Sequence, residues 1–320
     1  MEISSPSLHF STASSSSSSF RRSPAPPLTA DLLLWERIEI AKWPRLLSVG
    51  RSACTLPGRA GSLHRNYRPM TYSCSQRREG TIITARSMND VYDALAERLI
   101  SNAVVATSLQ SKYIVGLAGP PGSGKSTVAS EVVRRVNKLW PRNPHSFDSE
   151  ASLLDVATIL PMDGFHLYRC QLDSMENPEE AHARRGAPWT FDPKRMLKCI
   201  KKLKNEGSVY APSFDHGAGD PLEDDIFISL QHKVVVVEGN YIFLDEGDWT
   251  AISSLFDEKW FIDVDIDKAM QRVLKRHVLT GKPPDVAGWR VEYNDRPNAK
   301  LIMESKKNAD LIVRSIDFQT

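Results

Sequence analysis

The sequence predicts a doubly wound α/β domain, a mainly parallel sheet flanked by helices, over about residues 87–320. Short apolar runs alternate with helical patterns along this part of the chain. The four valines at 234–237 show no polar alternation, which is typical of a strand covered on both faces of a parallel sheet. The glycine-rich stretch "GLAGPPGSGKST" at 116–127 joins an apolar run to a helical pattern. We find neither an internal repeat nor a second domain boundary in this region.

The individual elements follow from apolar spacing and from turn residues. Helices are expected at 88–104, 125–140, 193–207 and 267–281. Strands are expected at 112–119, 157–166, 209–215, 233–241, 259–265 and 309–316. A loop of weak pattern covers 141–152, and a long polar and helical stretch reaches Asn308. The helix that begins at Pro193 ends at Gly207, which is the usual asymmetry of helix termini.

The glycine-rich stretch fits the pattern G-x-x-x-x-G-K-[ST], in which backbone N–H groups surround phosphate oxygens at a helix N-terminus. Lys125 is expected to reach the β- and γ-phosphates, and the Ser126 hydroxyl is expected to bind Mg²⁺. The residues assigned to nucleotide binding are Gly119, Pro120, Pro121, Gly122, Ser123, Gly124, Lys125, Ser126 and Thr127. The sequence therefore predicts a site for the phosphates of ATP, with Mg²⁺.

Two acidic residues follow strands that should end at the same edge of the sheet. Asp163 follows "ILPM", and Glu238 follows the valine run. Ligands of open α/β sheets bind beyond the carboxyl ends of the strands. Phosphoryl transfer to a hydroxyl needs a carboxylate that deprotonates the acceptor and acids that hold Mg²⁺ directly or through water. We assign Asp163 as the base and Glu238 as the Mg²⁺ or water ligand, and the reverse assignment stays open.

The bulk properties narrow the function. The net charge of +2 gives no reason to expect a nucleic-acid partner, and no apolar run approaches the roughly 18 residues of a membrane helix. A GTPase should carry an NKxD-type motif late in the chain, and "NDRPNAK" at 294–300 is not one. These observations favour a kinase that phosphorylates a hydroxyl of a small metabolite. The alternatives are a nucleotide-binding regulatory protein and an ATPase without a small-molecule acceptor.

Residues 1–86 differ from the rest in composition. They contain twelve basic and five acidic side chains, a net charge of +7, which leaves −5 for the remainder. The stretch "STASSSSSSFRRS" at 11–23 is rich in serine and arginine. Such acid-poor composition is typical of an organelle transit peptide. We therefore expect a disordered targeting segment over 1–86 and a location in the chloroplast, with the mitochondrion or the cytosol as the alternatives.

Several segments together resemble the uridine kinase / phosphoribulokinase family, which includes bacterial-type pantothenate kinase. They are "GPPGSGKST", "PMDGFH", "PSFDHGAGDP", "VVVVEGNY" and "RVLKRHVLTGK", in the order of the family. "DGFH", "RRGAPWTFD" and "FDHGAGDP" resemble most its less-characterised members, some of them linked to sugars such as fructose. The resemblance covers about 87–320 and implies a P-loop NTPase fold with a small mobile lid. It also implies ATP, Mg²⁺ and a sugar, nucleoside or vitamin precursor as acceptor.

The same resemblance supports Asp163 as the base and Glu238 as the acid at the metal. It implies acceptor contacts from the segment "YAPSFDH" and from residues near Asp163; the residues assigned to the substrate are His166, Tyr168, Arg185, Tyr210, Phe214, Asp215 and His216. Arg272 and Arg276, four residues apart on one helical face, match the arginines of the lid. Asn294, Asp295, Arg296 and Asn298 are expected near the nucleotide base. A homo-oligomer stays open as a further partner.

Overall fold

The computed structural model describes residues 81–83, 85, 87–106, 112–140 and 155–314. The expected targeting segment lies outside the described residues, apart from the few that follow residue 80. The weak loop at 141–152 and the last two residues of the strand expected at 309–316 also lie outside them. No helix among the described residues is long and apolar enough to cross a membrane.

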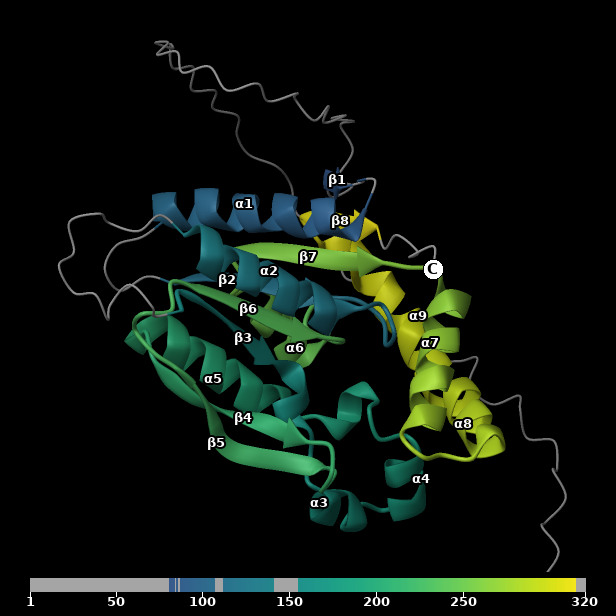
Figure 1. Cartoon of the computed structure of the whole chain (residues 1–320). Coiled ribbons are helices and arrows are strands. Elements are labelled where there is room, and N and C mark those ends of the chain that lie inside the picture. Colours follow the sequence, from purple (N-terminus) through teal and green to yellow (C-terminus); the bar gives the residue numbers. More distant parts are fainter. Residues whose placement is uncertain (1–80, 84, 86, 107–111, 141–154, 315–320) are drawn as a thin grey trace, which may run out of the picture. The chain divides into compact units, whose positions relative to one another are not determined.

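Six strands of the described chain form one parallel sheet in the order β1-β8-β7-β2-β6-β3 (Figure 1). Their bounds are Thr81–Ile83 for β1, Tyr113–Ala118 for β2, Ala157–Pro161 for β3, Val234–Gly239 for β6, Glu258–Asp263 for β7 and Leu311–Arg314 for β8. All of these strands except β1 were expected from the sequence, and they are confirmed with shorter ends. The predicted doubly wound fold is therefore confirmed.

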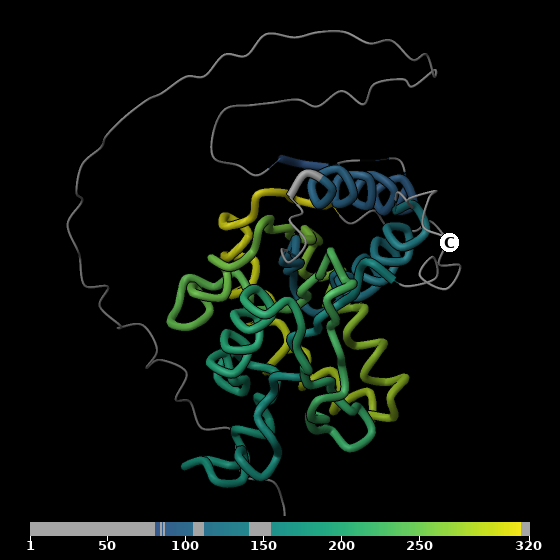
Figure 2. The backbone as a smooth tube through the Cα atoms, turned by 90° about the vertical axis from the view of Figure 1, so that its left-hand side faces the viewer, coloured from purple at the N-terminus to yellow at the C-terminus, as the bar shows by residue number. Residues whose placement is uncertain are grey.

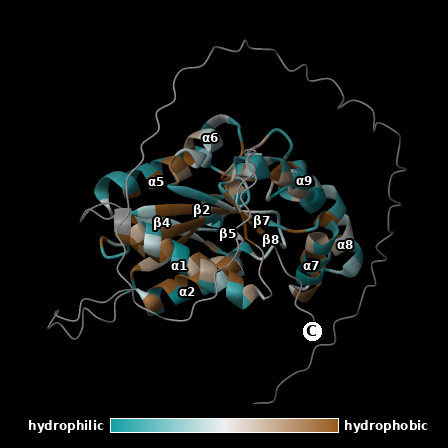
Figure 3. Ribbon diagram, turned by 90° about the horizontal axis from the view of Figure 1, so that it is seen from above, coloured by the Kyte–Doolittle hydropathy of each residue, from teal (hydrophilic) through white to brown (hydrophobic). Residues whose placement is uncertain are grey.

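Helices cover both faces of this sheet, as Figure 3 shows from above. On one face lie α1 (Met88–Ala106) and α2 (Lys125–Leu139), and on the other lie α5 (Pro193–Glu206) and α6 (Gly247–Ser253). The valine run explains how both layers are held. Val234 and Val236 pack with α1 and α2, whereas Val235 and Val237 pack with α5 and α6, because successive side chains of a strand point to opposite faces.

The sheet begins earlier in the chain than the sequence analysis expected. β1 precedes residue 87 and pairs in parallel with β8, from Thr81 opposite Leu311 to Ile83 opposite Val313. Figure 2 shows the yellow C-terminal segment beside the blue segment that contains β1. The expected division at residue 86 is therefore corrected: at least residues 81–83 belong with the domain.

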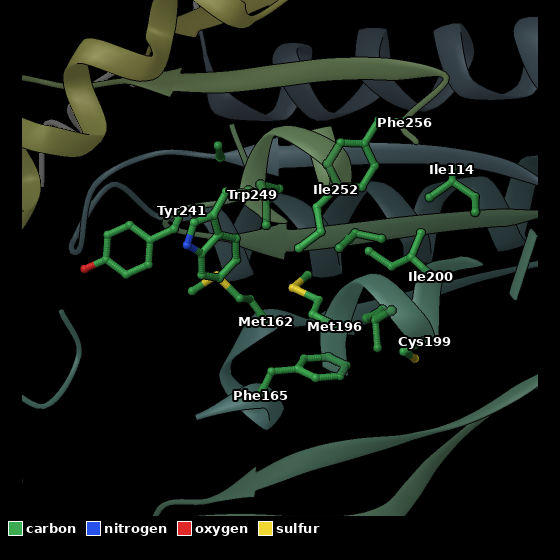
Figure 4. Packing of buried hydrophobic residues seen from close by; sticks show 14 of the residues in the cluster. Ile114, Met162, Phe165, Met196, Cys199, Ile200, Tyr241, Trp249, Ile252 and Phe256 are labelled. Carbon is green, nitrogen blue, oxygen red and sulfur yellow. The ribbon is translucent and has the colours of Figure 1, made fainter. Parts of the chain in front are cut away.

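A two-stranded antiparallel hairpin follows α5 along the chain. β4 (Val209–Asp215) was expected, but its partner β5 (Asp220–Ile228) was not. The core between hairpin, sheet, α5 and α6 holds the side chains labelled in Figure 4, such as Met196 and Ile200 of α5 and Trp249 of α6. In that view Tyr241, which follows β6, lies at the edge of the cluster with its hydroxyl pointing away from it.

The remaining elements connect the strands of the sheet. After β3 come the turn η2 (Met162–Phe165) and the short elements α3 (Arg169–Asp173), α4 (Pro178–Ala183) and η3 (Pro188–Thr190). After β7 come α7 (Ile266–Leu279), α8 (Pro284–Arg290), the π-helical turn η4 (Val291–Asp295), α9 (Arg296–Glu304) and η5 (Ser305–Asn308). Val273 of α7, Val291 of η4 and Ala299 of α9 share a small apolar cluster, so these elements pack as a group.

Candidate active site

The loop between β2 and α2 has the backbone that a phosphate site requires. Gly122 and Gly124 adopt positive φ angles of 78° and 91°, which favour glycine. A Cβ at Gly122 would lie 2.3 Å from the carbonyl oxygen of Ala269 on α7, so only glycine fits there. Gly124 is the N-cap residue of α2 and supplies no side chain, which leaves the first N–H groups of the helix without a side-chain cap. The helix N-terminus is therefore suited to an anion.

Lys125, Ser126 and Glu238 meet beside this loop. The Ser126 hydroxyl donates to Glu238 Oε2 at 2.9 Å, and Lys125 Nζ donates to the Pro120 carbonyl at 3.2 Å. Burial lowers the pKa of Lys125 to about 8, although the carboxylates of Glu238 and Asp163 oppose that change. Burial raises the pKa of Glu238, whereas Lys125 and Ser126 oppose the rise. The two side chains thus lie in a partly desolvated site where electrostatic interactions are strong.

Asp163 lies in η2, directly after β3. In the sheet, β6 lies between β2 and β3, and Glu238 pairs with Leu117 on one side and with Pro161 on the other. The phosphate loop, Glu238 and Asp163 therefore follow one another along the carboxyl edge. Gly164 holds η2 against the hairpin, since a Cβ there would lie 2.1 Å from the Pro212 carbonyl oxygen.

One cavity of about 320 Å³ unites these groups. Its lining residues are Pro121, Gly122, Gly124, Lys125, Ser126, Thr127, Pro161, Met162, Asp163, Glu238, Gly239, Asn240, Arg272, Val273 and Arg276. Gly119, Pro120 and Ser123 belong to the same loop without lining the cavity. The two acids and the phosphate loop, far apart in the sequence, are thus brought together. Asn240, which the sequence analysis missed, could have been found because it follows Glu238 by two residues.

The two lid arginines reach the same cavity from α7. Arg272 Nη1 donates to the carbonyl oxygen of Gly122 at 3.2 Å, which fixes α7 to the phosphate loop. Arg276 also lines the cavity, and its charge acts on Lys125. The helix that follows β7 therefore closes the side of the cavity opposite Glu238 and Asp163 with two cations.

The expected acceptor residues separate into two groups. His166, Phe214 and His216 form an aromatic cluster next to Asp163. The His166 ring lies 3.9 Å from that of Phe191 and 4.7 Å from that of Phe214, and Phe214 lies 5.3 Å from His216. His166 Nδ1 lies 2.8 Å from the Asp163 carbonyl oxygen. Burial lowers the pKa of His166, so its imidazole is neutral at pH 7.

Arg185 and Tyr168 use their polar atoms for contacts with other parts of the protein, Arg185 in a partly buried position and Tyr168 in an exposed one. Arg185 donates to the Leu167 carbonyl at 2.9 Å, to Asp220 at 3.0 Å and to the Gly219 carbonyl. The Tyr168 hydroxyl donates to Glu223 on the hairpin. Both side chains therefore hold the hairpin against the segment after Asp163, rather than line the cavity.

Asp215 and Tyr210 also lie away from the cavity. Asp215 Oδ1 accepts from the backbone N–H of Gly217 at 2.7 Å and closes the turn between β4 and β5. Tyr210 is 58% exposed and stacks on Phe227 with ring centroids 4.5 Å apart. The described ring contacts of the His166 cluster involve neither the Tyr210 side chain nor the Asp215 side chain. The motif alone could not separate Tyr210 and Asp215 from Phe214 and His216, since all four residues come from the continuous segment 210–216.

Asn294 and Asn298, expected near the nucleotide base, are buried. They are only 2% and 4% exposed, and Asn294 donates to the carbonyl oxygen of Arg185 at 3.2 Å. Asp295 pairs with His277, and Arg296 pairs with Asp267 and Glu292. These four residues bind other groups of the protein and do not line the cavity, and their expected place near the nucleotide base stays a prediction.

The residues present fit a nucleotide with its magnesium ion. Ser123 Oγ is buried and, within the described part of the chain, has no hydrogen-bond partner. A phosphate oxygen in the loop would give it one. The Ser126 hydroxyl and the Glu238 carboxylate offer adjacent oxygen atoms, the ligand type that Mg²⁺ prefers.

Comparison with known proteins agrees with this arrangement. The profile of the "Phosphoribulokinase / Uridine kinase family" matches residues 114–319. A Schizosaccharomyces pombe protein named "Putative uridine kinase C227.14" is 34% identical over 228 residues, which span 70% of this chain and 92% of that protein. The crystal structure of a "putative fructose transport system kinase" from Silicibacter has a TM-score of 0.56 and 28% identity, covering 68% of this chain and 98% of its own. YFH7 of Saccharomyces cerevisiae shares the fold, with a TM-score of 0.57, 22% identity, and coverage of 72% of this chain and 100% of its own.

Proposed function

This chain belongs to the phosphoribulokinase / uridine kinase family of P-loop kinases, and we propose that it transfers the γ-phosphoryl group of ATP to a hydroxyl of a small metabolite. The observation that carries the proposal is the single cavity lined by the phosphate loop, Asp163, Glu238 and the two arginines of α7. A site that only binds a nucleotide needs the loop, whereas a second carboxylate and cations on the opposite side serve a transfer reaction.

On the donor side, the loop N–H groups and Lys125 hold the phosphates, and Arg272 and Arg276 face the charge that develops on the transferred group. Ser126 and Glu238 would hold Mg²⁺. The ion, when bound, neutralises phosphate charge and favours departure of ADP. The reverse roles of Glu238 and Asp163 remain the alternative, and the position of Asp163 nearer the His166 cluster favours Asp163 as the base.

On the acceptor side, Asp163 takes the proton of the attacking hydroxyl, whose oxygen then bonds to the γ-phosphorus. His166 donates from Nδ1 to the Asp163 carbonyl in its neutral form, which leaves Nε2 as a hydrogen-bond acceptor for another hydroxyl. Phe214 and His216 add an aromatic wall. Hydrogen-bonding groups beside a ring suit a polyhydroxylated acceptor such as a sugar or nucleoside, or a vitamin precursor.

The test is a panel of acceptors with labelled ATP and Mg²⁺. Two relatives are named for uridine and for fructose, so both compounds belong in the panel, with other sugars, nucleosides and pantothenate. One acceptor should stimulate ADP release and become labelled. Asp163→Asn should bind ATP as the wild type does and lose transfer by at least ~10²-fold, the low end for a positioned base. ADP release that no acceptor stimulates would indicate an ATPase. A complete absence of ADP release would indicate a regulatory nucleotide-binding protein.

We also propose that the N-terminal segment directs the protein to the chloroplast, on its serine- and arginine-rich, acid-poor composition. Because β1 begins at Thr81, the segment tested should be residues 1–80 rather than 1–86. A fluorescent protein carrying residues 1–80 should enter plastids. Mitochondrial or cytosolic fluorescence would refute the proposal.

A further inference from the structure

The helices after α7 contain a π-helical turn, η4, which joins α8 directly to α9. The N–H of Arg296 donates to the carbonyl oxygen of Val291, five residues earlier. Pro297 follows at once; it has no N–H for the carbonyl of Tyr293, and its ring would crowd that carbonyl in a regular helix. The widened turn accommodates the proline. Such turns are rare and often lie at functional sites.

Asp295 connects this turn to the lid helix. Its Oδ2 lies 2.8 Å from His277 Nε2, and each of the two side chains is 13% exposed. His277 belongs to α7 and is the neighbour in sequence of Arg276. The contact therefore fixes the end of the helix that carries both cavity arginines.

Asn294, the preceding residue, points to another part of the molecule. Its Nδ2 donates to the carbonyl oxygen of Arg185 at 3.2 Å, and Arg290 Nη2 donates to the same oxygen at 3.0 Å. Asn298 donates to Asn294 Oδ1 at 3.0 Å, which orients the amide so that its amino group faces Arg185. Two donors from the lid, by which we mean α7, α8 and η4 together, thus converge on one carbonyl.

The side chain of Arg185 connects the lid contacts of its own carbonyl to the proposed acceptor side. It binds the carbonyl oxygens of Leu167 and Gly219, and its guanidinium lies over the Phe214 ring at 5.5 Å. From the core, the hydroxyl of Tyr241, at the edge of the cluster in Figure 4, donates to the Gly186 carbonyl. The segment 184–186 is therefore held by the core, by the lid and by the residues that follow Asp163.

We propose that η4 couples the lid to the acceptor side, with Asn294 and Asp295 as positioning residues for the two arginines of α7. The inference rests on the proposed function. If the acceptor side shifts, the Arg185 carbonyl loses its donors, and leaving buried polar groups unpaired is costly. The contact of Arg272 with the Gly122 carbonyl holds α7 at its phosphate-loop side, and η4 holds the end of α7 near Arg276 while the segment 184–186 is in place. Neither residue touches a reacting atom.

The test is a double-mutant cycle in the full chain, with Asn294→Ala and His277→Ala. No described hydrogen bond or ion pair joins Asn294 to His277, so independent effects should add within about two-fold. Coupling through η4 predicts that each change lowers kcat by about 10-fold and that the double variant is no worse than the single ones. The affinity for ATP stays within about two-fold, because the phosphate loop is untouched.

A second measurement needs no acceptor. Amide hydrogen exchange in Asn294→Ala should rise by at least about 5-fold in α7 as well as in 184–191. Asp295→Asn keeps an oxygen that accepts from His277 and should behave as the wild type, whereas Asp295→Ala should not. Glu292→Gln is the matched control, since Glu292 lies on the same turn but pairs with Arg296 at the surface.

Additive effects in the cycle, or faster exchange confined to 184–191, would overturn the coupling. If Asn294→Ala does not fold, Asn298→Ala removes the bond that orients the Asn294 amide and repeats both measurements. A failure of the proposed function can be distinguished from a failure of the coupling. If the proposed function is wrong, no acceptor stimulates ADP release by the wild-type protein. The hydrogen-exchange experiment still reports whether α7 responds to the change at Asn294.

Discussion

The phosphate-loop side of the cavity, which is the proposed donor side, and the proposed acceptor side around Asp163 are built in different ways. The donor side is mostly backbone: nine consecutive residues form the loop and the start of α2, and glycines at positive φ give it its shape. The proposed acceptor side begins at Asp163 and continues beyond the cavity lining to η2, the segment 184–191 and the hairpin, which side-chain contacts hold together. A backbone cradle suits a constant ligand such as a polyphosphate. A surface assembled from side chains can change its ligand without changing the fold.

The largest expected effect is a loss of phosphoryl-transfer rate on removal of Arg276, one of the two cations of α7 at the proposed donor side. Arg276→Ala should lower the rate of phosphoryl transfer by about 10³-fold, because arginines that neutralise the transferred group contribute roughly 10³–10⁵. Lys275→Ala is the matched control, since it removes the same charge from the next position of α7, which does not line the cavity. Rates are measured with the acceptor found in the panel. Equal losses in the two variants would mean that only the net charge of α7 matters.

The next effect tests the backbone of the donor side through stability. Gly122→Ala should destabilise the protein by about 3 kcal/mol, from a positive φ angle and from overlap with the Ala269 carbonyl. Gly124→Ala also has a positive φ angle, but nothing lies within 4 Å of its Cβ, so we expect only about 1 kcal/mol. Urea unfolding of the two variants measures the difference. Equal losses would show that the contact between loop and α7 carries no stability.

The difference between a side built from consecutive backbone and a side built from distant side chains explains which parts the sequence could predict. The sequence predicted the phosphate loop, and it predicted that the strand with the valine run is buried on both faces. Both predictions rest on patterns of consecutive residues. β1 was missed because Thr81–Ile83 is a strand only through its pairing with β8, 230 residues away at Thr81 and Leu311. β5 was missed because its centre, Glu223–Asp225, is acidic and lacks strand alternation.

The acceptor residues show the same limit. The carbonyl oxygen of Arg185 accepts a hydrogen bond from Asn294, which lies 109 residues later in the sequence. No local pattern could indicate that contact. Tyr168 is held by Glu223, which lies 55 residues away. The sequence therefore indicated which segments to expect around an acceptor, but not which side chains of those segments bind other parts of the protein.

A smaller effect concerns the pH dependence of the donor side. The pKa of Lys125 is lowered to about 8 in the folded protein, and phosphate oxygens prefer the charged ammonium. The affinity for ATP should therefore fall by up to about 10-fold for each pH unit above 8. In the unfolded chain Lys125 keeps its proton up to the ordinary lysine pKa of 10.5, so the unliganded protein gains stability from Lys125 as the pH rises from about 8 to 10.5.

Fluorescent ATP analogues titrated between pH 7.5 and 9.5 measure this dependence. Lys125→Met should bind more weakly and show a much flatter profile over the same range. A wild-type profile as flat as that of the variant would mean that Lys125 stays protonated throughout, and that the loop backbone dominates phosphate binding.

The smallest expected effect separates the two groups of acceptor-side residues. Tyr210 lies on the outer face of the hairpin, four residues before Phe214 and therefore roughly 13 Å from it along the strand, with an irregularity of the strand register between them. Tyr210→Ser should leave kcat/KM for the acceptor within about two-fold and cost at most about 1 kcal/mol of stability, from the lost stacking on Phe227. Phe214→Leu should raise the acceptor KM by about 3- to 10-fold, because it removes the ring against His166. The two variants change the same strand on either side of that irregularity. A larger kinetic loss in Tyr210→Ser than in Phe214→Leu would place the acceptor on the outer face of the hairpin and remove the cluster of His166, Phe214 and His216 from the site.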